Sequence, residues 1–220
     1  MKLTKEVLEI LRNFASINTN LVIKPGKKIT TMSATKDILA EYESDLEFEK
    51  QISIFNLSEF LGAYSAFNEP ELIFDDKFLT IKQGKQQVKY IYADESVLIT
   101  PKKEIKMPST EIKVKLSSDM LTRLQKMSTI LSVEDFAIIG DGSKISVKVF
   151  DKKNPTANAF EVDLEVESAE NFQVNFKVEK LRLLSSDYDV EISNKKISRW
   201  SATNVKLIVF VAVEADSVFN

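Results

Sequence analysis

The chain has 220 residues, 44% of them hydrophobic and 29% charged, which is enough to bury a core in one large domain or in two of roughly 110 residues. It contains no histidine and no cysteine, which removes the commonest general base, the commonest metal ligand and every thiolate zinc site. The net charge of −3 does not favour a basic nucleic-acid binder, and neither a membrane span nor a signal peptide is evident. We therefore expect a soluble protein of a reducing compartment that has no cofactor or metal and is not an enzyme.

The first predicted element is an amphipathic helix that follows an N-cap hydroxyl at Thr4, and the same pattern returns 113 residues later behind Ser117. In both segments the apolar residues keep the spacing i, i+1, i+4, i+7 of one helical face. These faces comprise Val7, Leu8, Leu11 and Phe14 in the first helix, and Met120, Leu121, Leu124 and Met127 in the second. The common register predicts an internal duplication.

Two acidic strands are also repeated. Residues 37–50 and 160–167 alternate apolar side chains with carboxylates, which is typical of half-buried strands with a charged outer face. A short helix is predicted after each strand, one capped by Asn56 and the other over 177–184. Further strands close each half, and they are predicted over 71–74, 78–81 and 87–93 in the first half and over 188–192, 196–199 and 206–213 in the second.

The lysine-rich segment 94–110, which contains Pro101 and Pro108, separates the halves. We predict an α+β protein of two similar domains, with helices on one face of antiparallel sheets. The first domain covers residues 1–108, including a connector from about residue 94, and the second covers residues 109–220. The alternative is that two unrelated α+β halves share these patterns by chance.

The predicted helical layer is net basic, whereas the outer face of the strands is strongly acidic. Charged helix faces are usually only solvated, but this face also suits a polyanion such as duplex DNA, which attracts lysine without any reading of its sequence. The carboxylates of 41–49 are interpreted as solvated charge rather than a catalytic cluster, because no acid–base partner is evident. Trp200, the only tryptophan, is expected to pack in the core. No phosphate-binding, zinc-protease or EF-hand motif is present.

Three stretches of the chain resemble the sliding clamps of T-even-type bacteriophages, the processivity factors of DNA polymerase. They are the opening Met1–Lys5 with Asn13–Asn18, the run Leu57–Gly62, and the ending Val211–Ser217. The resemblance covers essentially the whole chain in order and length, and it is closest at the two ends.

The resemblance implies the DNA-clamp fold and a ring of three subunits, lined by helices, through which double-stranded DNA passes. It implies DNA polymerase, an ATP-dependent clamp loader and the late-transcription machinery as partners, no membrane, and the cytoplasm of the infected bacterial host as location. The second helix departs from the expected pattern because it has no basic residue, so we expect an uneven lining that is concentrated in the second domain.

Within this family the basic residues of the helices and of their entry strands are predicted to face DNA. They are Lys5, Arg12, Lys115, Arg123, Lys126, Lys177 and Lys180. Apolar residues of the connector and the C-terminus either pack against the core or border a groove for partner peptides. They are Leu98, Ile105, Met107, Val218 and Phe219. Two other functions stay open, a duplicated structural or interaction protein of a virus and, less favoured, a carboxylate-based hydrolase.

Overall fold

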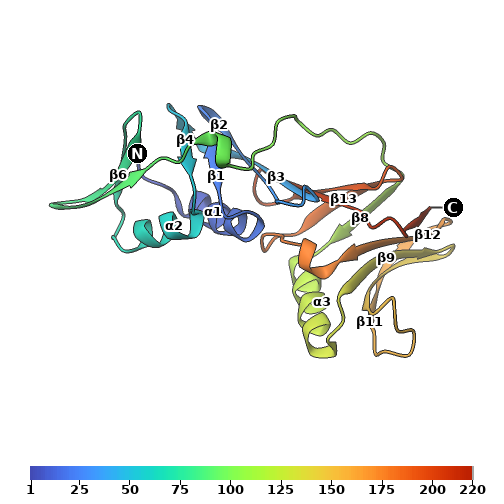
Figure 1. Cartoon of the computed structure of the whole chain (residues 1–220). Helices are drawn as coiled ribbons and strands as arrows, with labels where there is room; N and C mark the ends of the chain where they lie inside the picture. Colours follow the sequence, from blue (N-terminus) through green and yellow to red (C-terminus); the bar gives the residue numbers. More distant parts are fainter. Residues whose placement is uncertain (220) are drawn as a thin grey trace. The chain divides into compact units, whose positions relative to one another are not determined.

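The computed structural model describes residues 1–219 (Figure 1). In this range the helices are α1 (Lys5–Ile17), α2 (Leu57–Ser65) and α3 (Ser118–Leu131), with the short 3-10 helices η1 (Glu95–Val97) and η2 (Val178–Lys180). The strands up to the connector are β1 (Leu21–Ile23), β2 (Gly26–Met32), β3 (Ile38–Phe48), β4 (Ile52–Ile54), β5 (Glu71–Phe74), β6 (Phe78–Gln83) and β7 (Gln86–Ile91). The later strands are β8 (Ile112–Leu116), β9 (Asp135–Asp141), β10 (Lys144–Phe150), β11 (Phe160–Glu167), β12 (Asn171–Lys177), β13 (Tyr188–Ser193), β14 (Ile197–Ala202), β15 (Leu207–Ala212) and β16 (Val218–Phe219).

The chain divides into two compact units. Unit 1 contains residues 1–104 together with 206–209, and unit 2 contains residues 105–205 and 210–220. Strand β15 therefore begins in unit 1 and ends in unit 2.

In unit 1 the strands pair antiparallel, β2 with β3, β1 with β4, and β5, β6 and β7 in order. Helix α1 packs on α2 and against β2 and β3, and both helices lie on the same side of these strands (Figure 1). The predicted acidic strand is confirmed as β3, whose residues from Tyr42 to Asp45 alternate between buried and exposed.

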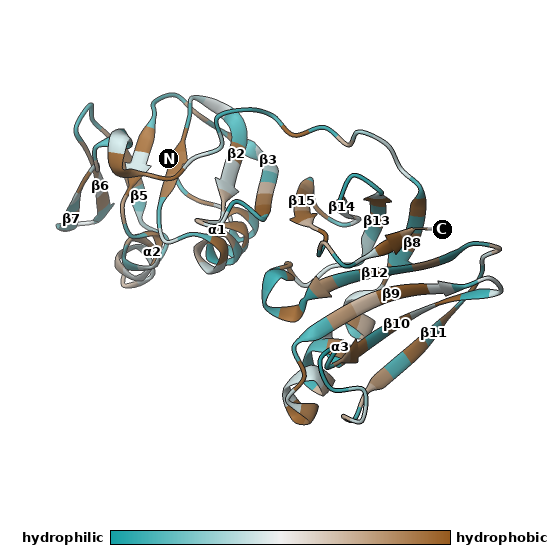
Figure 2. Cartoon of the chain, turned by 45° about the vertical axis from the view of Figure 1, so that its right-hand side comes forward, coloured by the Kyte–Doolittle hydropathy of each residue, from teal (hydrophilic) through white to brown (hydrophobic). Residues whose placement is uncertain are grey.

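In unit 2 a five-stranded sheet has the order β11-β10-β9-β12-β16, and β13 pairs with β8 and β14. Helix α3 packs against β10 and β11. The second acidic strand is confirmed as β11, along which hydrophilic and hydrophobic residues alternate (Figure 2). Trp200 is fully buried between Phe176 and Tyr188 and donates a hydrogen bond of 2.9 Å to Ser198, so its predicted packing role is confirmed.

The repeat is visible in the order of the elements. From α1 to β7 unit 1 runs helix, four strands, helix, three strands, and from α3 to β15 the same order returns with η2 in the place of α2. Both predicted caps are present, because the hydroxyls of Thr4 and Ser117 accept hydrogen bonds from the backbone N–H groups of Val7 and Met120. The side chain of Asn56 caps α2 in the same way, with the N–H of Glu59 at 3.1 Å.

The predicted helix over 177–184 is wrong. Lys177 still belongs to β12, where it is paired with Asp135, and the helical turn that follows covers only Val178–Lys180. Lys177 stands at the N-cap position without a side-chain hydrogen bond to the helix. A lysine cannot accept such a bond and Val178 is β-branched, so the segment lacks the local features that begin an α-helix.

None of the helices in residues 1–219 is long and apolar enough to cross a membrane.

Candidate nucleic-acid interface

Helix α1 presents two of the predicted DNA-facing residues to solvent. Its apolar stripe is buried, from Val7 to Ile17, whereas Lys5, Glu9 and Arg12 are not. Glu6 is engaged elsewhere, because its carboxylate accepts a hydrogen bond from the hydroxyl of Tyr42 on β3. Burial and this hydrogen bond raise the pKa of Tyr42, so the hydroxyl stays a donor at neutral pH. The outer face of α1 thus carries two bases and one acid.

Helix α3 repeats this arrangement. Leu121 and Leu124 are buried against the sheet, and Arg123 and Lys126 are exposed on the outer side. No ion pair within residues 1–219 engages Arg123 or Lys126. Two equivalent helices therefore each hold two cations in water, where they can meet an extended anion without losing an internal partner.

The other three predicted DNA-facing residues do not lie on α-helices. Lys115 is on β8, where its ammonium is 3.6 Å from Asp189 on the neighbouring strand. Lys177, at the end of β12, pairs with the buried Asp135 at 2.7 Å. Lys180 in η2 pairs with Glu214 at 3.0 Å.

Lys177 and Lys180 therefore form ion pairs within unit 2 in this structure. The two charges of an ion pair that is partly shielded from water attract each other more strongly than those of an exposed pair. The expected concentration of positive charge in the second domain followed from the lack of a basic residue in the second helix, and it counted Lys177 and Lys180. In residues 1–219 the exposed bases on α-helices are two in each unit.

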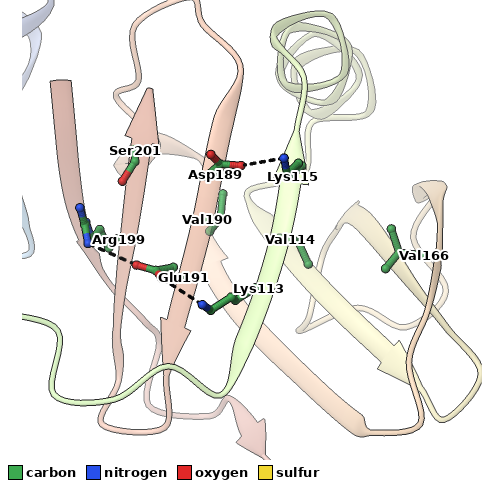
Figure 3. A pocket seen from close by; sticks show the side chains of 9 residues that line it. All are labelled: Lys113, Val114, Lys115, Val166, Asp189, Val190, Glu191, Arg199 and Ser201. Carbon is green, nitrogen blue, oxygen red and sulfur yellow. Dashed lines mark hydrogen bonds and ion pairs between the residues drawn. The ribbon is translucent and has the colours of Figure 1, made fainter. Parts of the chain in front are cut away.

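Sequence reasoning missed a charged cavity of about 600 Å³ on the outer face of β8, β13 and β14 (Figure 3). Glu191 lies between Lys113 at 3.6 Å and Arg199 at 3.4 Å, and the pair of Lys115 and Asp189 lies beside them. The signal was present as lysines alternating along 113–115 opposite acids alternating along 189–191. The charged side chains of this cavity form ion pairs with one another, and none of them is a nucleophile next to a base. The cavity is therefore a surface of the sheet with salt bridges and not a reaction centre.

Of the residues predicted to border a partner groove, Leu98 is buried in unit 1, and Ile105 and Met107 belong to unit 2. Val218 and Phe219 are brought together as strand β16, which pairs with β12. The Lys196 ammonium lies 4.9 Å from the centre of the Phe219 ring and donates a hydrogen bond to the carbonyl of Ser217. The C-terminal strand is thus attached to unit 2, although Val218 itself is 49% exposed.

Solved structures share this fold. The A. fulgidus PCNA bound to the C-terminal region of FEN-1 matches with a TM-score of 0.70 at 13% identity, over 99% of this chain and 98% of that one. The Helicobacter pylori beta clamp bound to a DNA ligase peptide matches with a TM-score of 0.72 at 11% identity, over 98% of this chain and 65% of that one. The fold, three α-helices and antiparallel sheets in the part of the chain that the structure describes, is that of the DNA sliding clamps.

Curated proteins are similar over the full length. The sliding clamp of Vibrio phage KVP40 is 28% identical over 98% of this chain and all of that protein, and the sliding clamp of Escherichia phage RB69 is 25% identical over 99% and 98%. The sliding clamp of Enterobacteria phage T4 is 28% identical over 71% and 70%. No protein-family model matches. The chain is thus similar over its full length to sliding clamps of T4-like phages, in agreement with the resemblance seen in its sequence.

Proposed function

We propose that three copies of this chain close into a ring around duplex DNA and tether the replicative DNA polymerase for processive synthesis. The observation that carries this proposal is the repeated cationic helix. Helices α1 and α3 occupy the same place in the two repeats and expose Lys5 and Arg12, and Arg123 and Lys126. The full-length similarity to phage sliding clamps supports the same function.

Retention on DNA in such a ring comes from topology. Duplex DNA carries one negative charge per ~1.7 Å, so a few exposed bases attract it without reading its sequence and leave low barriers to sliding. Release requires a subunit interface to open, which turns a weak, salt-sensitive attraction into long residence. A tethered polymerase then meets the primer end at an effective concentration of about the mM range. The clamp makes and breaks no bond in this process.

Two unpaired sheet edges support a head-to-tail ring. Strand β7 is an edge of unit 1 and β11 is an edge of unit 2. Each edge exposes a large apolar residue, Ile91 at 61% and Val166 at 43%. Exposed apolar edges are liabilities unless another strand covers them, and a head-to-tail contact repeated between identical chains can close a ring.

Peptides of partner proteins are expected to dock on the ring. Two of the similar structures hold such partners, since the A. fulgidus PCNA is bound to a region of FEN-1 and the H. pylori beta clamp to a DNA ligase peptide. For this chain we propose the polymerase, an ATP-dependent clamp loader and the late-transcription machinery as partners, in the cytoplasm of the infected bacterium. Leu98, Ile105, Met107, Val218 and Phe219 stay the predicted border of the docking groove.

Retention on circular DNA tests this function. Clamp loaded by its loader and ATP on nicked circular DNA is expected to stay bound in a salt wash and to be lost when the circle is linearised. The R123A/K126A double variant is expected to form the same oligomer by native mass measurement but to support less processive synthesis at raised salt. The K36A/K153A variant, which removes two exposed lysines from loops, is the matched control. Retention that does not depend on a closed circle would contradict a ring, and would favour a structural protein.

A further inference from the structure

The cavity on the outer face of β8, β13 and β14 has no role in the function proposed above. Its volume of about 600 Å³ is within the range of small-molecule sites, and it extends from β14 to the edge strand β11. Val114 on β8 and Val166 on β11 point toward each other across it (Figure 3). Val166 is 43% exposed although it is apolar, so this part of the cavity is an uncovered apolar surface.

Unit 1 fills the corresponding space with its own side chains. The strand pairs β2–β3 and β10–β11 both contain a shift of register, and the residues paired just past this shift are Phe48 in β3 and Val166 in β11. Phe48 is 2% exposed and packs edge-on against Phe74 of β5, with the ring centres 6.5 Å apart. Valine has no ring that could make such a contact, so unit 2 leaves open a space that an aromatic ring occupies in unit 1.

The charged residues around this apolar surface leave one positive charge in excess. Three cations, Lys113, Lys115 and Arg199, face two acids, Asp189 and Glu191. Glu191 is shared between Lys113 at 3.6 Å and Arg199 at 3.4 Å, and Asp189 lies 3.6 Å from Lys115. One carboxylate of a ligand therefore balances the charges of the cavity.

The two lysines on β8 are able to turn toward such a carboxylate. Their side chains are 71% and 91% exposed, and the distances of 3.6 Å to Glu191 and Asp189 are longer than a hydrogen bond. Exposed ion pairs contribute little free energy, so a lysine loses little when it changes its partner. Lys113 and Lys115 lie on either side of Val114 along β8, so a carboxylate held by them stands beside the apolar surface (Figure 3).

We infer that this cavity binds a small aromatic carboxylate. The ring of the ligand lies between Val114 and Val166, in the space that Phe48 fills in unit 1, and its carboxylate pairs with Lys113 and Lys115. Both parts of the ligand are needed, because a neutral aromatic compound makes no ion pair and an aliphatic acid has no flat ring to place between the two valines.

The site belongs to unit 2, since all the residues that line the cavity lie in that unit. It requires neither DNA nor a second copy of the chain. Val166 is on the edge strand β11 that we assign to the ring, but its side chain points toward β8 (Figure 3), whereas a strand added to the free edge of β11 pairs through the backbone. The ring and the ligand site therefore use different parts of β11.

Titration of the chain with naphthoate, followed by NMR of the valine methyl groups, tests the site. The neutral amide naphthamide and the aliphatic acid hexanoate are the reference compounds. Naphthoate is expected to bind with a Kd on the order of 1 mM, as a fragment of its size does, and to shift the methyl signals of Val114 and Val166. Each reference compound is expected to bind about fivefold more weakly. Equal binding of either reference compound, or no shift at these two valines, would overturn the proposal.

Filling the cavity from within locates the binding site. Val166→Phe gives unit 2 the residue that unit 1 has at this place, and it is expected to abolish naphthoate binding because its own ring occupies the space. The control is Val97→Phe, at a valine of unit 1 that is 61% exposed, and it is expected to bind as wild type does. Binding by Val166→Phe at the wild-type level would show that the cavity is not the site.

A change of charge is the second test, and it stands even if Val166→Phe does not fold. Lys113→Gln is expected to weaken naphthoate binding about threefold to fivefold, as the loss of an exposed ion pair does. Lys153→Gln removes the same charge from an exposed loop and is expected to have no effect. Equal binding by these two variants would overturn the assignment of the carboxylate to Lys113. Retention on circular DNA is a separate readout, so failure of this site leaves the ring untouched.

Discussion

The two units differ most at the place of their second helix. In unit 1, β4 ends at Ile54 and α2 then runs for nine residues behind the cap of Asn56. In unit 2, β12 continues to Lys177 and passes directly into η2, which has three residues. The same place in two similar element orders can therefore hold an α-helix or a single 3-10 turn. Which of the two forms depends on where the preceding strand stops and on whether a capping side chain follows it.

Helix α2 and the η2 segment bury their apolar residues in different ways. Helix α2 inserts Leu57, Phe60, Leu61 and Tyr64 into the core of unit 1. Unit 2 buries Leu181 just after η2, where its carbonyl accepts a hydrogen bond of 3.3 Å from Gln125 on α3. The ion pairs of Lys177 and Lys180 then fix the position of the η2 segment, whereas backbone hydrogen bonds fix the residues of an α-helix.

The largest effect is expected when the main ion pair of the η2 segment is broken. Lys177→Met removes the partner of Asp135, a carboxylate in a residue that is 2% exposed. A buried charge left without its partner costs about 3 kcal/mol, so the free energy of unfolding in urea is expected to fall by ~2–4 kcal/mol. The exposed Lys153→Met is the control. A variant as stable as wild type would show that the pair does not hold this segment.

The cap of α2 is the corresponding weak point of unit 1. Asn56→Ala removes the side chain that accepts a hydrogen bond from the N–H of Glu59, and the loss of such a cap costs about 1 kcal/mol. Urea unfolding is expected to report this decrease, and Asn56→Asp, which retains an acceptor, is expected to keep most of the stability. If Asn56→Ala has no effect, the cap does not explain why unit 1 has a helix at this place.

Sequence patterns identified α1, α2 and α3 with their caps, because the hydroxyl or amide and the apolar stripe lie within a few residues of one another. The strands β3 and β11 were equally visible, since alternation is a local signal. The segment 177–184 failed because the pairing of Lys177 with β9 lies more than 40 residues away and takes that residue from the helix. The candidate site was likewise predictable only in part. The helical wheel placed Arg12 and Lys126 on the outer face, but it could not reveal that Lys180 pairs with Glu214.

A charge added to α2 sharpens the comparison of the helical faces, since α2 has no basic residue. Gly62 is exposed in α2, and a Cβ there would meet no atom within 4 Å. Gly62→Lys and its control Gly62→Ala are both expected to raise the free energy of unfolding by ~0.5–1 kcal/mol, because glycine is a poor helix former. The lysine variant alone is expected to stay longer on circular DNA at raised salt. Equal retention of the two variants would show that this face of α2 does not approach DNA.

The smallest effect is expected at the turns that join the first two strands after α1 and after α3. Unit 1 uses Pro25 and Gly26 there, whereas in unit 2 the carboxylate of Asp141 accepts hydrogen bonds of 2.9 Å from the N–H groups of Ser143 and Lys144. These bonds, with one from the Ser143 hydroxyl, lower the pKa of Asp141 to about 2.

A lowered carboxyl pKa stabilises the fold above the unfolded value near 4, and this contribution is lost as the pH falls toward 2. Asp141→Asn is therefore expected to unfold at a slightly lower urea concentration than wild type at pH 7, and the difference is expected to shrink between about pH 4 and pH 2. A difference that is the same at both ends of this range would mean that the ionised carboxylate does not stabilise the turn, and that this charge does not distinguish the turn of unit 2 from the turn of unit 1.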